Sequence, residues 1–158
     1  MTRAFLLIVA MLTLGGCFQE PVMSLDPPVS VPFVTVEQGT SSGIRDARFL
    51  VVRTEKAWKD LWAAHAAAVT PPPAPPAIDF AQEMVVAVFS GERPTGGSRV
   101  QIQGVETQSR QNVIIVTYQQ SDAPSGAMTT QVLTQPFHMV KAKKSEGLPT
   151  FMRRPGAS

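Results

Sequence analysis

The strongest hydrophobic run in the chain is Met84 to Phe89, six consecutive apolar residues of which three are valine. A short apolar run of this composition, bounded by turn residues, predicts a strand that is buried on both faces. Downstream, Val100 and Ile102 alternate with polar residues. Alternation with a period of two predicts a second strand, with one buried face and one solvated face.

The segment that joins these two strands, Gly91–Ser98, has the composition of an ordered loop. Pro94 fixes its own φ, and the two neighbouring glycines allow the chain to turn tightly without a Cβ clash. Binding residues concentrate on loops that a rigid scaffold positions. We therefore take four residues of this loop as candidate partner-binding residues: Arg93, Thr95, Gly96 and Gly97.

Two roles are open for Arg93. Because it precedes a proline, its backbone favours an extended conformation. Its planar guanidinium then suits a carboxylate on a partner protein. In the structural alternative, Arg93 pairs within the domain, with Asp79 or Glu92 as the nearby carboxylates.

The remaining strand signals are segments rich in β-branched and aromatic residues. Pro136 interrupts the last of them, so it must lie at a bulge, a bend or a sheet edge. The segments are residues 31–37, 48–53, 113–118 and 128–142.

One segment changes to helical periodicity. Thr54 is a suitable N-cap, and Glu55 in the first turn complements the helix dipole. Apolar side chains then recur at spacings of three and four, which predicts an amphipathic helix whose stripe faces the core. The stripe contains Trp58, Leu61, Trp62, Ala66 and Val69, and His65 is expected at its edge. A ligand platform formed by the two tryptophans is the alternative interpretation of this stripe.

The helix must end before Pro71–Pro76, since this proline-rich run cannot continue it. We interpret the run as a stiff connector in the polyproline II conformation. The alternative is a ligand segment that binds in an aromatic groove. Asp79 with Gln82 three residues later resembles a capping box and predicts one short helical turn before Met84. Together these elements predict an α+β domain of mostly antiparallel sheet, sandwich- or barrel-like, with one main amphipathic helix.

The N-terminus has the pattern of an export signal. Arg3 precedes a short apolar core that is too short to span a bilayer, and small residues follow. Leu14-Gly15-Gly16-Cys17 resembles the bacterial lipobox, which implies cleavage before Cys17 and lipidation of its sulfur. Cys17 is the only cysteine of the chain. Several acyl chains would form a stable anchor. The alternative is an ordinary export signal with a buried or removed cysteine.

These signals divide the chain into four parts: a signal peptide at 1–16, the lipidated cysteine with an extended tether at 17–31, a folded domain at 32–153, and a tail at 154–158. Phe18 would follow the lipidated cysteine. Gram-negative lipoproteins with an aspartate at that position commonly stay in the inner membrane. A lipid-anchored envelope protein sorted to the outer membrane is therefore expected if the source has two membranes.

The order of several blocks resembles the C-terminal domain family of the protease-complex subunit PrcB, over about residues 39 to 151. The blocks are Ala57-Trp58-Lys59-Asp60-Leu61-Trp62, Ile78-Asp79-Phe80, Met84-Val85-Val86-Ala87-Val88, Arg93-Pro94-Thr95-Gly96-Gly97 and Thr134-Gln135-Pro136-Phe137-His138-Met139-Val140. The family usually carries an aromatic residue, often tyrosine, where this chain has Ser98. The resemblance implies a non-catalytic lipoprotein associated with an exported protease or its maturation.

The chain carries no nucleophile elbow, phosphate-binding glycine loop or zinc-ligand spacing. We expect no catalytic residues, no cofactor and no metal site, although His138 with Asp122 or Asp79 is the one metal alternative. The formal charge is +2, or +1 without Arg3, so nucleic acid is not an expected partner. The basic groups Lys141–Lys144 and Arg153–Arg154 are interpreted as a solvated tail, with a patch for anionic lipids as the alternative.

Three functions remain at this point. The first is a lipid-anchored, non-catalytic interaction or stabilising subunit for another exported protein, such as a protease. The second is a binding protein for a small envelope ligand, a glycan or peptide, in a pocket lined by Arg93–Ser98. A hydrolase of unrecognised type ranks last.

Overall fold

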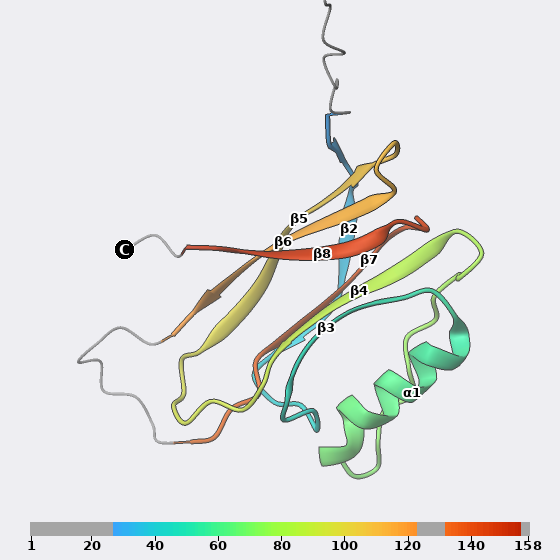
Figure 1. Ribbon diagram of the computed structural model, residues 1–158. Helices are drawn as coiled ribbons and strands as arrows, with labels where there is room; N and C mark the ends of the chain where they lie inside the picture. The colour runs from blue at the N-terminus through green and yellow to red at the C-terminus, as the bar shows by residue number, and fades with distance from the viewer. Residues whose placement is uncertain (1–26, 123–131, 156–158) are drawn as a thin grey trace, which may run out of the picture.

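The computed structural model describes residues 27–122 and 132–155. Its strands form two four-stranded sheets that pack face to face, and one helix covers the outer face of one sheet (Figure 1). In chain order the elements are β1 (Val29–Ser30), β2 (Phe33–Gly39), β3 (Ala47–Val52), α1 (Glu55–His65), η1 (Ala66–Ala68), β4 (Glu83–Ser90), β5 (Arg99–Gln108), β6 (Val113–Ser121), β7 (Phe137–Lys143) and β8 (Leu148–Arg154).

The first sheet has the strand order β1-β5-β6-β8 and the second has the order β2-β7-β4-β3. All strand pairs are antiparallel except β6 with β8, which run parallel. The predicted fold class, α+β with mostly antiparallel sandwich-like sheets and one main helix, is confirmed.

Strand β4 lies in the middle layer and is buried on both faces, as its apolar run predicts. Val85, Ala87 and Phe89 face α1 and belong to one hydrophobic cluster. The alternate residues, Met84, Val86 and Val88, face the other sheet and belong to a second cluster. Successive strand side chains point to opposite faces, so this single strand supplies both cores.

Helix α1 begins where the sequence predicts, because the Thr54 hydroxyl accepts a hydrogen bond from the Ala57 N–H at 3.3 Å. The stripe of Trp58, Leu61 and Trp62 is buried against the sheet, as expected, whereas Val69 is exposed. The helix therefore contributes a core stripe that is one turn shorter than the periodicity indicated.

The proline-rich segment after α1 lies against the helix rather than apart from it. The indole N–H of Trp58 donates to the carbonyl of Pro76 at 3.0 Å, and that of Trp62 donates to the carbonyl of Pro73 at 2.8 Å. Buried indole N–H groups usually find such an acceptor. The segment thus completes the tryptophan environment within the same chain.

The turn before β4 forms as predicted, but a different side chain closes it. Asp79 Oδ1 accepts from the Ala81 N–H at 3.0 Å, and the Asp79 N–H donates to the carboxylate of Glu83 at 3.4 Å. Gln82, the residue expected to reach back with its side chain, instead donates its backbone N–H to the Asp79 carbonyl.

Two segments predicted to lie outside the domain are part of it. β1 pairs with β5 although residues 17–31 were expected to be tether, and β8 extends to Arg154.

The interpretation of Lys141–Lys144 as part of a solvated tail is wrong, because 141–143 lie in β7, and Lys141 forms a 2.9 Å ion pair with Glu83. The ion pair lowers the pKa of the Glu83 carboxyl. Within the described ranges no helix has the length and apolarity needed to cross a bilayer.

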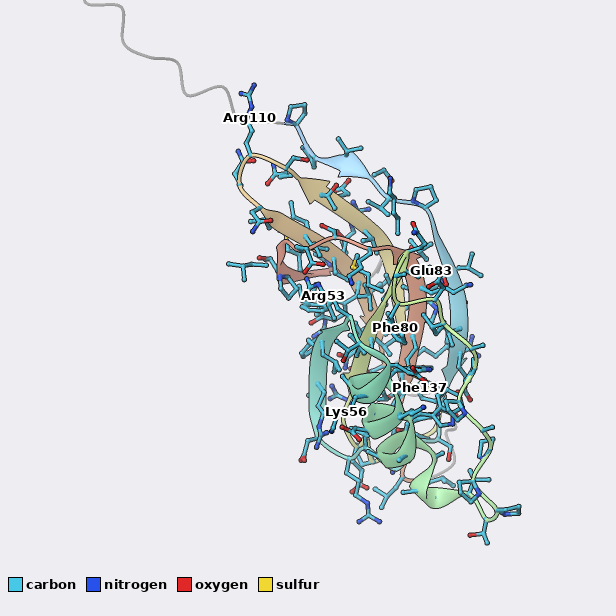
Figure 2. All side chains as sticks on the ribbon, turned by 90° about the vertical axis from the view of Figure 1, so that its right-hand side faces the viewer. Arg53, Lys56, Phe80, Glu83, Arg110 and Phe137 are labelled. Atoms are coloured by element: carbon cyan, nitrogen blue, oxygen red, sulfur yellow. The ribbon has the colours of Figure 1, made fainter. Side chains whose placement is uncertain are left out.

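The two ends of β5 define two poles of the domain. The chain enters at the N-terminal pole, where Val29 pairs with Thr107 near the β5–β6 turn; Figure 2 labels Arg110 at the tip of that turn. The β4–β5 connection lies at the opposite, distal pole, where β5 begins at Arg99 (Figure 1). Ten residues of strand separate the poles, which corresponds to about 30 Å.

Candidate partner-binding site

The loop 91–98 lies at the distal pole and is fastened to the segment 132–136 by backbone hydrogen bonds. Arg93 and Thr134 form an isolated antiparallel bridge, with N–H···O distances of 2.7 and 2.9 Å. The Thr134 hydroxyl also donates to the carbonyl of Thr95 at 3.1 Å. Two segments that are distant in the chain, the loop 91–98 and the segment 132–136, therefore form one surface, which we call the distal surface.

Gly91 makes the exit from β4 possible. Its φ is +75°, a conformation that residues with a side chain rarely adopt. A Cβ there would also lie 2.9 Å from the backbone nitrogen of Ala47. The sharp turn lets the Glu92 N–H donate to the carbonyl of Arg45 at 2.8 Å, which attaches the loop to the start of β3.

Arg93 is half-buried, and its guanidinium points back toward β4. One terminal nitrogen donates to the Ser90 carbonyl at 3.3 Å, and Nε is buried without a partner in the described ranges. The proposed internal pairing with Asp79 or Glu92 is wrong for these ranges. Asp79 precedes β4, at the other end of that strand from Arg93, and Glu92 instead approaches Arg45 at 3.9 Å.

The exposed part of the distal surface is mostly uncharged. Pro94 and Gly97 are exposed, and Thr95 and Gly96 are half-buried. Beside them, Val132 and Leu133 are 56% and 60% exposed. Of the predicted residues, Gly97 is thus exposed, whereas Arg93, Thr95 and Gly96 are only partly accessible. Sequence reasoning missed Val132 and Leu133, since an apolar pair in a β-prone segment is usually assigned to a core.

Ser98 is not a surface residue. It is 1% exposed, and its hydroxyl donates to the carboxylate of Asp122 at 3.1 Å. The position at which the family usually carries an aromatic residue is therefore buried in this chain and lies beneath the distal surface. Here the position closes the loop onto the end of β6.

A polar groove of about 580 Å³ begins directly after the loop. Its lining comes from the ends of β2 and β6 and the start of β5: Gln38, Gly39, Thr40, Arg99, Val100, Gln101, Gln119 and Ser121. The expected pocket lined by Arg93–Ser98 is therefore displaced to the residues that follow the loop. No signal in the sequence brings β2 beside β5, because these strands belong to different sheets.

A Ser–His–Glu arrangement, in which the serine and the histidine are buried, lies where β2 meets the end of α1. His65 Nδ1 is 2.9 Å from the hydroxyl of Ser42, and Nε2 is 3.2 Å from the carboxylate of Glu37. The hydroxyl also accepts from the Ile44 N–H at 3.1 Å, and Ser42 is only 5% exposed. Burial lowers the pKa of His65 and Glu37 opposes this shift. The arrangement holds the 42–44 segment against the helix.

His65 and His138 are both core residues. His65 is 6% exposed, not at the edge of the helix stripe as expected, and its ring contacts that of Phe137 edge-on at 4.4 Å. Figure 2 shows Phe137 beside α1.

His138 connects the two sheets. Its Nδ1 accepts from the Ile102 N–H at 2.8 Å, so its proton lies on Nε2, which bonds the Thr35 hydroxyl at 3.0 Å. Burial lowers the pKa of His138. A metal could bind this imidazole only by displacing one of these two bonds. The described ranges also contain no group of three or more metal-ligating residues.

The predicted lipidation site, Cys17, lies outside the described residues, so its modification stays a prediction.

Comparison with known proteins gives one result. No curated protein and no solved structure matches the chain. A family model described as PrcB C-terminal matches residues 84–143. These residues span β4 to β7 and include both segments of the distal surface, but not α1. The match confirms, over this segment, the resemblance of the chain to the PrcB C-terminal family.

Proposed function

We propose that this chain is a lipid-anchored, non-catalytic envelope protein that binds and stabilises another exported protein, such as a protease, through its distal surface. The family resemblance of residues 84–143 supports association with a protease. The single observation that carries the choice of surface is the exposed apolar pair Val132 and Leu133 beside a fastened loop. Apolar side chains that a fixed backbone presents are typical of interface centres.

The position of the distal surface fits an anchored protein. Cys17 precedes β1, and β1 joins the domain at the N-terminal pole. A tether that arrives at that pole leaves the other end of β5, about 30 Å away, free to face a partner. Anchoring through Cys17 would then hold the protein at the membrane while the loop 91–98 and segment 132–136 point away from the attachment point.

A crosslinking pull-down of the processed protein from envelope membranes tests this proposal. Leu133→Arg should abolish recovery of a partner, because it places a charge in an apolar contact. Leu148→Arg is the matched control, since Leu148 is 71% exposed and lies in β8, away from the distal surface. Equal recovery with both variants would contradict the proposed surface.

The groove beside the loop favours the second candidate, a binding protein for a small envelope ligand. Its volume of about 580 Å³ lies within the range of about 300–1,000 Å³ that is usual for small-ligand sites. A soluble glycan or peptide that protects the protein thermally, with no protein recovered in the pull-down, would favour this candidate.

A further inference from the structure

The groove at the start of β5 exists because that strand lacks a neighbour there. β1 has only two residues and pairs with Glu106 and Thr107, at the other end of β5. The first residues of β5 therefore have β6 on one side and an open edge on the other. β2 lies across this opening but hydrogen-bonds to β7 in the other sheet.

Side chains already satisfy two of the backbone groups that face the open edge. The Gln38 amide donates to the carbonyl of Val100 at 3.0 Å. The Ile102 N–H donates to Nδ1 of His138 at 2.8 Å. A partner strand cannot pair with β5 here without displacing both bonds, so strand addition is disfavoured and a ligand must bind the side chains that line the groove.

Two glutamines that line the groove, Gln101 and Gln119, offer hydrogen-bond donors. The amide nitrogen of Gln103 donates to Oε1 of Gln101 at 3.3 Å and to Oε1 of Gln119 at 3.4 Å. Each of these two carbonyl oxygens accepts one hydrogen bond, and the amide N–H groups of Gln101 and Gln119 remain available as donors. Such an arrangement suits a ligand rich in acceptors.

Arg99 supplies the positive charge. It is the only charged residue among the described residues that line the groove, it is exposed, and it makes no ion pair or side-chain hydrogen bond within 27–122 and 132–155. A guanidinium matches a carboxylate with two parallel hydrogen bonds. Burying such a pair beside amide donors would leave each oxygen of the carboxylate with partners.

We propose that this groove binds the carboxylate of an extended peptide segment, with Arg99 as the anchoring residue and the amides of Gln101 and Gln119 as additional donors. The inference rests on the proposed function in one respect, which is that the segment belongs to the partner protein. The carboxylate comes from either a C-terminus or an acidic side chain, and the experiment separates these two sources.

The test is a titration of the ¹⁵N-labelled processed protein, purified in detergent, with random pentapeptide pools. One pool has a free C-terminus, a second is amidated and lacks acidic residues, and a third is amidated with a central glutamate. We expect the first or third pool to shift the side-chain resonances of Arg99, Gln101 and Gln119, and the neutral pool to leave them unchanged. The pool that acts identifies the source of the carboxylate.

Arg99→Gln should weaken this binding by about 10- to 100-fold, the range expected for the loss of a charged hydrogen-bonded pair. Arg99→Lys should restore part of it. Arg110→Gln is the matched control, because Arg110 is exposed at the other pole, and it should change nothing. The circular dichroism spectrum of each variant verifies the fold.

Three results of the titration would overturn the inference: equal binding of the neutral pool, equal binding by Arg99→Gln, or saturation of the shifts by glucuronate with no effect of any peptide. The last result would identify a glycan site instead. Peptide binding without partner recovery in the envelope pull-down would refute the proposed function alone. Partner recovery that is undiminished in Arg99→Gln, without peptide binding, would refute only this inference.

Discussion

Replacement of His138 tests how the two sheets are joined. His138→Leu keeps a side chain of similar size but removes the acceptor of the Ile102 N–H, in a position where Ile102 is 2% exposed. An unsatisfied buried N–H costs about 1–3 kcal/mol. The Thr35 hydroxyl also loses its partner, but Thr35 is exposed, so water replaces it. We therefore assign the cost to the Ile102 N–H.

His138→Asn is the matched variant, because its side-chain oxygen can accept in place of Nδ1. Thermal unfolding followed by circular dichroism should give the order wild type, then Asn, then Leu. The loss for Leu corresponds to a decrease of roughly 4–12 °C in Tm for a domain of this size. A Leu variant as stable as the wild type would refute the assigned role of the Ile102–His138 hydrogen bond.

The same variants predict a pH dependence. Burial lowers the pKa of His138 below its ordinary value of 6.5, and it also lowers that of His65. The unfolded chain therefore binds more protons than the folded chain as the pH falls below 6.5. Stability is full above that pH and is lost on acidification. His138→Asn should flatten this loss between about pH 7 and about pH 5, with His65 responsible for the remaining slope.

Further predictions concern the anchor, the core and the loop. Cys17→Ser should move the protein from the detergent phase to the aqueous phase and remove the acyl mass; an unacylated, water-soluble wild type would disprove lipidation. Trp58→Ala should destabilise the domain by about 3–5 kcal/mol, and a Tm unchanged within a few degrees would show that the helix face is misassigned. Gly91→Ala should cost more than about 1 kcal/mol, because of its φ of +75° and the close Ala47 backbone. Gly104→Ala is the control, because a Cβ there meets nothing closer than 4.0 Å. Equal Tm values for the two alanine variants would contradict the backbone strain assigned to position 91.

The local elements could be predicted from the sequence where a single segment contains its own signal. The double burial of β4 follows from an uninterrupted apolar run, and the start of α1 follows from Thr54 and the change of period. Two strands were missed because they depend on partners elsewhere. β1 has two residues and forms only against β5. β8 contains Pro149, and a proline in a sequence normally argues against a strand.

The environments of polar residues could not be predicted from the sequence for a related reason. His65 is buried because Ser42 and Glu37, both distant in the sequence, satisfy its ring nitrogens. Ser98 is buried because its hydroxyl donates a hydrogen bond to the carboxylate of Asp122. Periodicity records which residues are apolar, but it contains no information on which polar groups meet across a fold. The sequence was enough to predict that the loop 91–98 is ordered. The direction of the Arg93 side chain and the groove beside Arg99 could be seen only in the structure.

Site-specific photo-crosslinking in intact cells tests the central claim, that the distal surface contacts an exported partner, most directly. A photoreactive residue in place of Leu133 lies on that surface, and one in place of Arg110 lies at the N-terminal pole. We predict that Leu133 yields a discrete crosslinked product with one exported protein and that Arg110 yields none. A product from Arg110 alone, or the same product from both positions, would contradict the account.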